Sequence, residues 1–106
     1  MKIFVLSRPE SWESFREIVQ VLPKDKSSYK LLVKGAGVTR CLRCEPTLFP
    51  YFHQFVLDGG RAYICRKSLK AFGIPENRPP DLFERVTDGQ LWLRNLSEEG
   101  FEVEEL

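Results

Sequence analysis

Short apolar runs alternate with amphipathic segments along this chain. Three runs of five residues are rich in aliphatic and aromatic side chains and are bounded by polar or turn-forming residues, so we predict buried strands at residues 2–6, 29–33 and 61–65. Residues 82–86 carry a weaker apolar pattern that indicates a short strand or turn, and residues 101–103 a final strand. The chain therefore offers four or five strands.

Apolar residues at helical spacing fill the intervals between these strands. The predicted helices cover residues 11–22, 46–57, 66–72 and 89–99. Ser11 is the candidate N-cap of the first helix, and Pro23 follows its end. Pro46 suits the first turn of the second helix, and Thr87 or Asp88 can cap the last one.

A glycine-rich turn, Gly35-Ala36-Gly37, follows the second predicted strand. Glycines there favour a left-handed turn and close backbone packing, and their N–H groups could also cradle an anion. The turn matches neither G-x-G-x-x-G nor a Walker sequence, so it does not support a nucleotide site. Residues 38–44 fit either a short helix or an irregular loop.

Alternation of strands and helices predicts βαβ units with right-handed crossovers. We therefore predict an α/β fold in which residues 1–106 form one domain, a three-layer sandwich with a central, mostly parallel sheet of four or five strands. The hydrophobic content of 42% is enough to fill its core. In such sheets ligands bind beyond the carboxyl ends of the strands, where the candidate chemistry should lie.

Charge and hydropathy exclude several classes of partner. Sixteen basic and fifteen acidic residues give a net charge of +1, and no run of lysine and arginine predicts nucleic-acid binding. No apolar stretch reaches membrane length, and no secretory signal begins the chain, so we expect a cytoplasmic protein. Its three cysteines should then be reduced, and are core residues, metal ligands or reactive thiols rather than a disulfide framework.

Cys65 is the first candidate for chemistry. It ends the third predicted strand, and Arg66 opens the helix that follows. The free N–H groups and positive dipole of a helix start, together with the cations of Arg66 and Lys67, favour the nucleophilic thiolate. The alternative is that Cys65 is a small buried hydrophobic residue at the end of a strand.

The second candidate is the C-x-x-C pair of Cys41 and Cys44. Such a pair can cycle between dithiol and disulfide or supply half of a zinc site, and the alternative is that both cysteines only pack under the sheet. His53, the only histidine, could complete a metal site with Cys41, Cys44 and Cys65, although the spacing matches no structural zinc motif. No carboxylate pair and no Ser-His-Asp arrangement stands out.

Several segments resemble the DsrE/DsrF/DsrH-like (TusBCD-like) sulfur-relay family. AYICRKSLKAFGI at residues 62–74 resembles the family segment in which a strand ends in a cysteine and a short helix closes with glycine. LLVKGAGV at residues 31–38 is similar to its second strand and "DGV"-type turn. Residues 86–91 with residues 99–103 are similar to its closing helix and strand, and residues 1–9 to the DsrH/TusB start.

This resemblance implies a DsrE-like fold and assembly into homo-oligomers or hetero-oligomers with related subunits. It also implies that Cys65 carries sulfane sulfur as a persulfide and passes it between a donor and an acceptor protein, without a cofactor. DsrH/TusB-like members lack that cysteine. Two departures are that Lys34 or Ala36 replaces the usual acidic residue before the turn glycine, and that the C-x-x-C pair is not a general family feature.

We therefore expect a sulfurtransferase-like sulfur carrier in which Cys65 is the persulfide nucleophile. Arg66 would stabilise the anion, and Cys41 or Cys44 would be possible resolving thiols. Two alternatives stay open. One is a non-catalytic oligomeric subunit of a DsrE/DsrH-like complex, and the other is a metal-binding or redox domain that uses Cys41, Cys44 and either Cys65 or His53.

Overall fold

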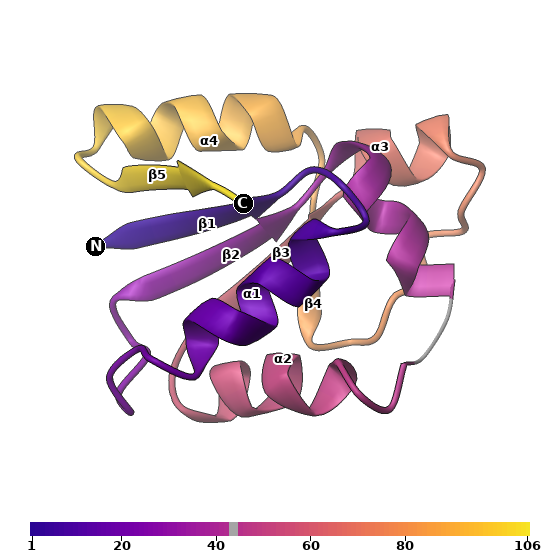
Figure 1. Cartoon of the computed structure of the whole chain (residues 1–106). Helices are drawn as coiled ribbons and strands as arrows, with labels where there is room; N and C mark the ends of the chain where they lie inside the picture. Colours follow the sequence, from indigo (N-terminus) through magenta and orange to yellow (C-terminus); the bar gives the residue numbers. More distant parts are fainter. Residues whose placement is uncertain (43–44) are drawn as a thin grey trace.

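A five-stranded sheet, parallel throughout, forms the centre of the computed structural model, which describes residues 1–42 and 45–106 (Figure 1). Its strands are β1 (Lys2–Leu6), β2 (Tyr29–Val33), β3 (Arg61–Cys65), β4 (Phe83–Val86) and β5 (Glu102–Glu105). They lie side by side in the order β4-β3-β2-β1-β5. The predicted α/β class and mostly parallel sheet are confirmed.

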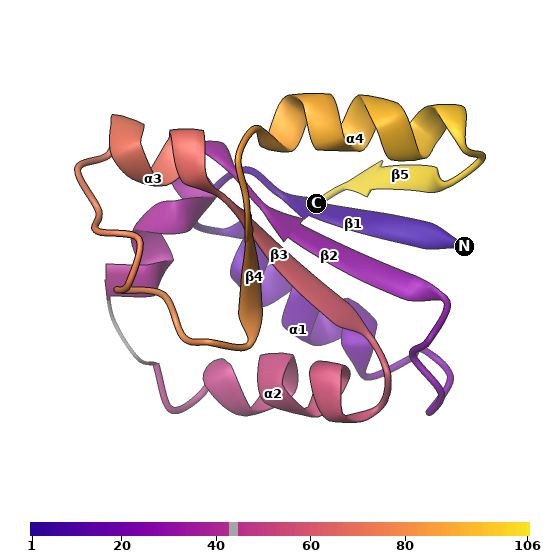
Figure 2. The same cartoon turned by 180° about the vertical axis from the view of Figure 1, so that it is seen from behind.

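Helices cover both faces of this sheet. They are α1 (Ser11–Val19), η1 (a 3-10 helix, Gly35–Leu42), α2 (Phe49–Leu57), α3 (Arg66–Ala71) and α4 (Gly89–Glu98). Helices α1 and α2 lie on one face and α4 on the other, while α3 and η1 lie together near the carboxyl ends of the strands (Figures 1 and 2). The three-layer sandwich is therefore present, with α3 and η1 at the edge where ligands usually bind.

The two faces of the sheet bury cores of different size. On the α1/α2 face, aromatic rings from both helices pack against the strands: the ring of Phe15 lies 4.9 Å from Phe52 and 5.2 Å from Phe55, centroid to centroid. On the α4 face a smaller cluster includes Tyr63 and Leu93. Because alternate residues of a strand point to opposite faces, each central strand contributes to both clusters.

Helices α3 and α4 each end one residue before the predicted bound, whereas α1 and α2 differ from the prediction by three residues at one end. Helix α1 ends at Val19 and not at residue 22, and Ser11 is its first residue rather than its N-cap, which is Glu10. The Ser11 hydroxyl does not cap the helix; it donates a hydrogen bond to the Leu106 carbonyl at 2.8 Å. Helix α2 begins at Phe49 and not at residue 46, with Pro50 in its first turn, where a missing N–H costs nothing.

Strand β5 lies one to two residues later than predicted. Its sequence, EVEE, is mostly polar, so no apolar pattern marks it. Pairing with β1 fixes its register, with Lys2 opposite Glu102 and Ile3 opposite Val103. The Lys2 ammonium lies 2.7 Å from a carboxylate oxygen of Glu104, which adds an ion pair at this exposed edge of the sheet.

The glycine turn after β2 has the predicted conformation and close packing. Gly35 has φ +56°, a left-handed value that favours glycine. A Cβ on Gly37 would lie 2.3 Å from the Leu6 carbonyl oxygen, so only glycine lets η1 approach β1 this closely. Between the two interpretations of residues 38–44, the structure shows 3-10 helix as far as Leu42.

None of the helices in residues 1–42 and 45–106 has the length and apolar character needed to cross a membrane.

Candidate active site at the carboxyl end of β3

Cys65 lies where β3 ends and α3 begins. It is the last residue of the strand and the N-cap of the helix, with extended backbone angles. Its neighbour Ile64 belongs to the α1/α2 core, so the Cys65 side chain points to the α4 face. The residue is only 4% exposed, so its thiol is covered in this structure.

The first residue of α4 supplies the closest donor to this thiol. The Gly89 N–H donates a hydrogen bond to Cys65 Sγ at 3.2 Å. Asp88 caps the same helix, because its Oδ1 accepts hydrogen bonds from the Gln90 and Leu91 N–H groups at 3.1 and 3.2 Å. The sulfur therefore lies beside the first turns of both α3 and α4.

A glycine at position 89 is what lets the backbone approach so closely. A Cβ there would lie 3.0 Å from Cys65 Cβ and 3.3 Å from both Cys65 Sγ and a methyl of Leu32. These distances are tighter than ordinary van der Waals contact, so any larger residue would press against the thiol. Gly89 is thus a specific part of the site and not only a helix start.

The balance of burial and hydrogen bonding sets the acidity of Cys65. Burial raises the pKa of its thiol, but the Ser68 hydroxyl, which hydrogen-bonds the sulfur, and the N–H groups of Gly89, Ser68 and Lys67 outweigh that effect. The net result is a pKa below the ordinary value for a cysteine. The thiol can therefore ionise more readily than a free one, as a nucleophile requires.

Ser68 was not among the residues singled out from the sequence. Its hydroxyl oxygen accepts a hydrogen bond from the Gly35 N–H at 2.8 Å, and its proton is then free to point at Cys65. This chain joins the glycine turn after β2 to the thiol after β3. The signal in the sequence is the C-x-x-S spacing of Cys65 and Ser68, which places the serine in the first turn of a helix, facing back to its N-cap.

Arg66, which the sequence predicts to stabilise the Cys65 anion, is instead paired with a carboxylate. Its guanidinium pairs with the Glu76 carboxylate at 2.8 Å, and both side chains are about half exposed. The groups that lower the Cys65 pKa are hydrogen-bond donors of Ser68, Gly89 and Lys67, and Arg66 is not one of the main ones. Lys67 likewise directs its ammonium elsewhere, to Asp88 at 3.1 Å.

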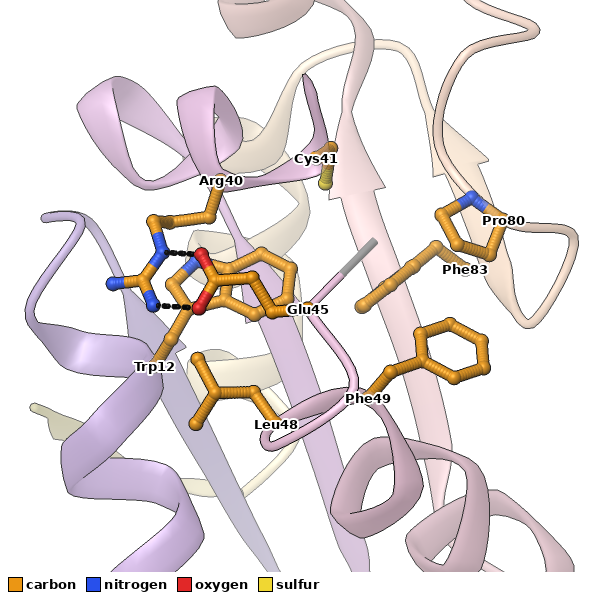
Figure 3. A pocket seen from close by; sticks show the side chains of 8 residues that line it. All are labelled: Trp12, Arg40, Cys41, Glu45, Leu48, Phe49, Pro80 and Phe83. Atoms are coloured by element: carbon orange, nitrogen blue, oxygen red, sulfur yellow. Dashed lines mark hydrogen bonds and ion pairs between the residues drawn. The ribbon is translucent and has the colours of Figure 1, made fainter. Parts of the chain in front are cut away.

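Cys41 lies on the opposite side of the sheet from Cys65. It is part of η1, packs in the α1/α2 core, and lines a small cavity with Trp12, Leu48 and Phe83 (Figure 3). Burial raises the pKa of its thiol to about 12, although the charge of Arg85 opposes this slightly. Cys41 is therefore a neutral thiol, and it is not placed to resolve a persulfide on Cys65. Its predicted partner, Cys44, lies outside the described residues.

An arginine clamp closes one side of that cavity (Figure 3). The guanidinium of Arg40 donates to both carboxylate oxygens of Glu13 at 2.9 and 2.7 Å and to both of Glu45 at 2.8 and 2.7 Å. It also donates to the Pro9 carbonyl at 2.8 Å. One side chain thus joins η1 to α1 and to the segment that precedes α2.

His53 is exposed on α2 and stacks on Phe49, with ring centroids 6.2 Å apart. Within residues 1–42 and 45–106, no group of three or more His, Cys, Asp or Glu side chains is arranged to hold a metal ion. The metal-binding alternative also used Cys44, which the structure does not describe.

Comparison with known proteins relates this chain to others by fold. No protein-family model matches its sequence, and no curated protein matches it significantly. Solved structures do match over nearly the whole chain. MTH1491 from Methanobacterium thermoautotrophicum, a protein of unknown function, has a TM-score of 0.78 at 20% identity, covering 98% of this chain and 96% of that one.

Two further structures extend the likeness. BT1422 from Bacteroides thetaiotaomicron, also of unknown function, has a TM-score of 0.74 at 12% identity, with 99% and 94% of the two chains covered. The ychN protein from E. coli has a TM-score of 0.69 at 16% identity, with 98% and 99% covered. The chain therefore shares its α/β fold, over nearly its whole length, with these three proteins.

Proposed function

We propose that this protein is a DsrE-like sulfur-relay protein, a sulfurtransferase-like carrier that holds sulfane sulfur as a persulfide on Cys65. The observation that carries the proposal is the thiol itself: it lies beside two helix starts, accepts the Gly89 N–H at 3.2 Å, and has a lowered pKa despite its burial. The sequence resemblance around residues 62–74 supports the same assignment. The donor and the acceptor are thiol-bearing cytoplasmic proteins.

The transfer needs two displacements at sulfur. The Cys65 thiolate attacks the outer sulfur of a donor persulfide, R–S–SH, a new S–S bond forms, and R–S⁻ leaves with the electron pair of the broken bond. Cys65 then carries –S–SH. An acceptor thiolate attacks that outer sulfur in the same way, takes it as its own persulfide, and regenerates the Cys65 thiolate. No net oxidation occurs, so the chemistry needs no cofactor.

The donors around the thiol match the charge that these steps develop. The Gly89 N–H and the Ser68 hydroxyl stabilise the Cys65 thiolate before it attacks the donor and again after the acceptor has taken the outer sulfur atom. We assign anion stabilisation to these groups and not to Arg66, which pairs with Glu76. Cys41 takes no part, since it is neutral and packs on the other face of the sheet.

A loading experiment tests the proposal. The purified protein is incubated with cysteine persulfide, and intact and peptide mass spectrometry locate any added sulfur atom. We expect one added sulfur on Cys65, lost in Cys65→Ser and retained in the matched variant Cys41→Ser. An adduct that persists unchanged in Cys65→Ser would overturn the assignment.

A second function is favoured by one observation, the burial of Cys65 to 4% exposure. A covered thiol suits a non-catalytic subunit of a DsrE/DsrH-like complex, in which the cysteine only packs. Iodoacetamide, a small neutral reagent, separates the two cases. If native protein resists alkylation at Cys65 for as long as it stays folded, the subunit function is favoured over transfer.

A further inference from the structure

The chain passes from β4 into α4 at the carboxyl end of β3, where Cys65 lies (Figure 2). Val86, the last residue of β4, is the register partner of Cys65, and Gly89 begins α4 and donates its N–H to the sulfur. The connection formed by residues 87–89 therefore lies against the thiol of a residue that is only 4% exposed. We call residues 87–89 the covering turn.

Polar contacts hold the covering turn against the first turn of α3. The Gly89 N–H meets Cys65 Sγ at 3.2 Å, and the Thr87 carbonyl accepts the Lys67 N–H at 3.3 Å. The Asp88 carboxylate pairs with the Lys67 ammonium at 3.1 Å. The ammonium is 71% exposed and the carboxylate 30%, so this ion pair contributes little free energy and breaks easily.

Asp88 uses its two carboxylate oxygens for different contacts. Oδ1 caps α4 by accepting the N–H groups of Gln90 and Leu91, whereas Oδ2 faces Lys67. The cap lies within α4, but the contact through Oδ2 joins α4 to α3 beside the thiol. The two contacts can be separated, because an asparagine at position 88 keeps a capping oxygen and lacks the negative charge.

The covered position of the thiol conflicts with what sulfur transfer requires. The outer sulfur of a donor must come within about 2.05 Å of Cys65 Sγ to form the new bond, and the rest of the donor follows it. Strands β2 and β3 lie inside the sheet, and α3 begins at Cys65 itself, so these elements are fixed. The covering turn belongs to none of them, and the helix that follows it packs on the smaller core. It is therefore the segment that has to move.

We infer that the covering turn is a lid over Cys65, that the Lys67–Asp88 ion pair is its latch, and that the lid lifts each time sulfur is taken up or released. The inference rests on the proposed function, because it concerns sulfur transfer at Cys65. Lys67 and Asp88 are thus positioning residues, whose side chains act on the sulfur through the place of the turn. A weak latch suits this role, since the lid opens and recloses in every cycle.

The rate of Cys65 alkylation at high pH tests the lid. Native protein is treated with iodoacetamide over a series of pH values, and the plateau rate, where the sulfur is fully ionised, measures access rather than acidity. We expect the plateau to rise about two- to fivefold in Asp88→Asn and in Lys67→Met, each of which removes the ion pair. Lys70→Met, at an exposed lysine three residues further along α3, is the control and should match the wild type.

Further measurements connect the latch to its mechanism. The double variant of Asp88→Asn and Lys67→Met should be no faster than either single variant, because both remove the same contact. Added salt should raise the plateau rate of the wild type and leave both variants unchanged, since salt screens an exposed ion pair. The rate of sulfur loading from cysteine persulfide should rise in each variant by the same factor as alkylation.

Equal plateau rates in the wild type, Asp88→Asn and Lys67→Met would overturn the inference, as would a double variant in which the two effects multiply. Thermal unfolding checks that each variant is folded, and Lys67→Met, which changes only an exposed side chain, keeps the test valid if Asp88→Asn weakens α4. Loading at the wild-type rate in variants with faster alkylation would defeat the lid and leave the proposed function intact. Faster alkylation without sulfur loading in any of the proteins would defeat the proposed function and leave a lid over a thiol of another purpose.

Discussion

Cys65 is acidic because hydrogen-bond donors surround a sulfur that burial alone would keep neutral. Burial removes water from the thiolate and so raises the pKa. The hydrogen bonds from the Ser68 hydroxyl and from three backbone N–H groups lower the pKa by more than burial raises it. One of these donors, the Gly89 N–H, comes from 24 residues away, and the Ser68 hydroxyl is itself held by the Gly35 N–H, 33 residues from Ser68. The acidity of the thiol is thus a property of the assembled sheet edge.

Ser68→Ala should raise the pKa of Cys65 and slow its reaction at neutral pH. The hydroxyl is the largest of the groups that lower this pKa, so its loss shifts the balance toward burial. The measurement is the pH dependence of Cys65 alkylation, read by peptide mass spectrometry, with the midpoint moving to higher pH. Ser97→Ala, an exposed serine on α4, is the control and should leave the midpoint in place. A midpoint that stays fixed in Ser68→Ala would show that the hydroxyl does not stabilise the thiolate.

The position of Cys65 could be predicted from sequence, but its partners could not. A strand followed directly by a helix puts the residue between them at the carboxyl edge of a parallel sheet, which is a local inference. The contact with Gly89 depends on how α4 lies across the sheet, and the pairing of Arg66 with Glu76 depends on a loop that returns to α3. Both are tertiary contacts that no periodicity encodes.

At the scale of the elements, most strands and helices follow from apolar spacing, and the exceptions have physical causes. The final strand is predicted one to two residues too early because three of the four residues of β5 are glutamates, so pairing with β1 and not an apolar pattern sets its bounds. The ambiguous region after β2 becomes η1 because Gly37 lets it pack against the Leu6 carbonyl and Trp12 donates its indole N–H to the Gly37 carbonyl at 2.8 Å. Contacts between distant residues decide these segments, and their own sequences do not.

The Arg40 clamp should stabilise the contact between η1 and α1. Arg40→Met keeps the aliphatic part of the side chain but leaves Glu13 and Glu45 unpaired, so we expect a loss of about 1–3 kcal/mol in the free energy of unfolding near neutral pH. Urea denaturation measures it. Arg61→Met is the control, because its pair with Glu84 is exposed and should cost less than about 1 kcal/mol. Equal losses in the two variants would contradict a special role for the clamp.

The stability that the Arg40 clamp contributes should also depend on pH. The hydrogen bonds of Arg40 hold the pKa of the Glu13 carboxyl below its usual value of 4.5. A carboxyl with a lowered pKa in the folded state contributes stability that is full above the unfolded pKa and is lost as pH falls through the folded pKa. The difference in unfolding free energy between the wild type and Arg40→Met should therefore shrink below about pH 4.

Gly37→Ala should be among the most damaging single-methyl changes in the chain. The added Cβ would lie 2.3 Å from the Leu6 carbonyl oxygen, and backbone on both sides prevents relief without separating η1 from β1. We expect a loss of about 2 kcal/mol or more, or failure to fold, measured by thermal unfolding. Gly100→Ala is the control that tests backbone conformation without crowding. Gly100 has φ +101°, but no atom lies near the position of an added Cβ, so the variant should lose about 1–2 kcal/mol of stability and still fold. A mild effect of Gly37→Ala would contradict the close approach.

At the scale of the whole molecule, the two faces of the sheet are unequally secured. The α1/α2 face holds a large aromatic core, whereas α4 alone covers the other face through a small cluster. The layered α/β architecture could be predicted from the alternation of elements. The strand order could not, because a pattern of apolar residues does not specify whether the last strand joins β4 or returns, as it does, to β1.

This asymmetry predicts that α4 opens before the rest of the molecule. Native-state hydrogen exchange should give the amides of α4 a lower opening free energy than those of β2, which lies at the centre of the sheet. Leu93→Ala, in the small cluster, should lower the value for α4 further and affect β2 less. Identical opening free energies for α4 and β2, in the wild type and in Leu93→Ala, would contradict this prediction.

The hydrogen bond from Gly89 to Cys65 joins the proposed nucleophile to α4, the helix that covers the face of the sheet with the smaller core. If the first turn of α4 opens as predicted, we expect the sulfur to become accessible to solvent and to lose the Gly89 donor together, so that its exposure rises while its thiolate is less stabilised. A reagent that needs the sulfur to be uncovered will react at a speed set by how often that turn lifts. We therefore expect the rate of Cys65 modification to report how firmly the first turn of α4 is packed on the sheet.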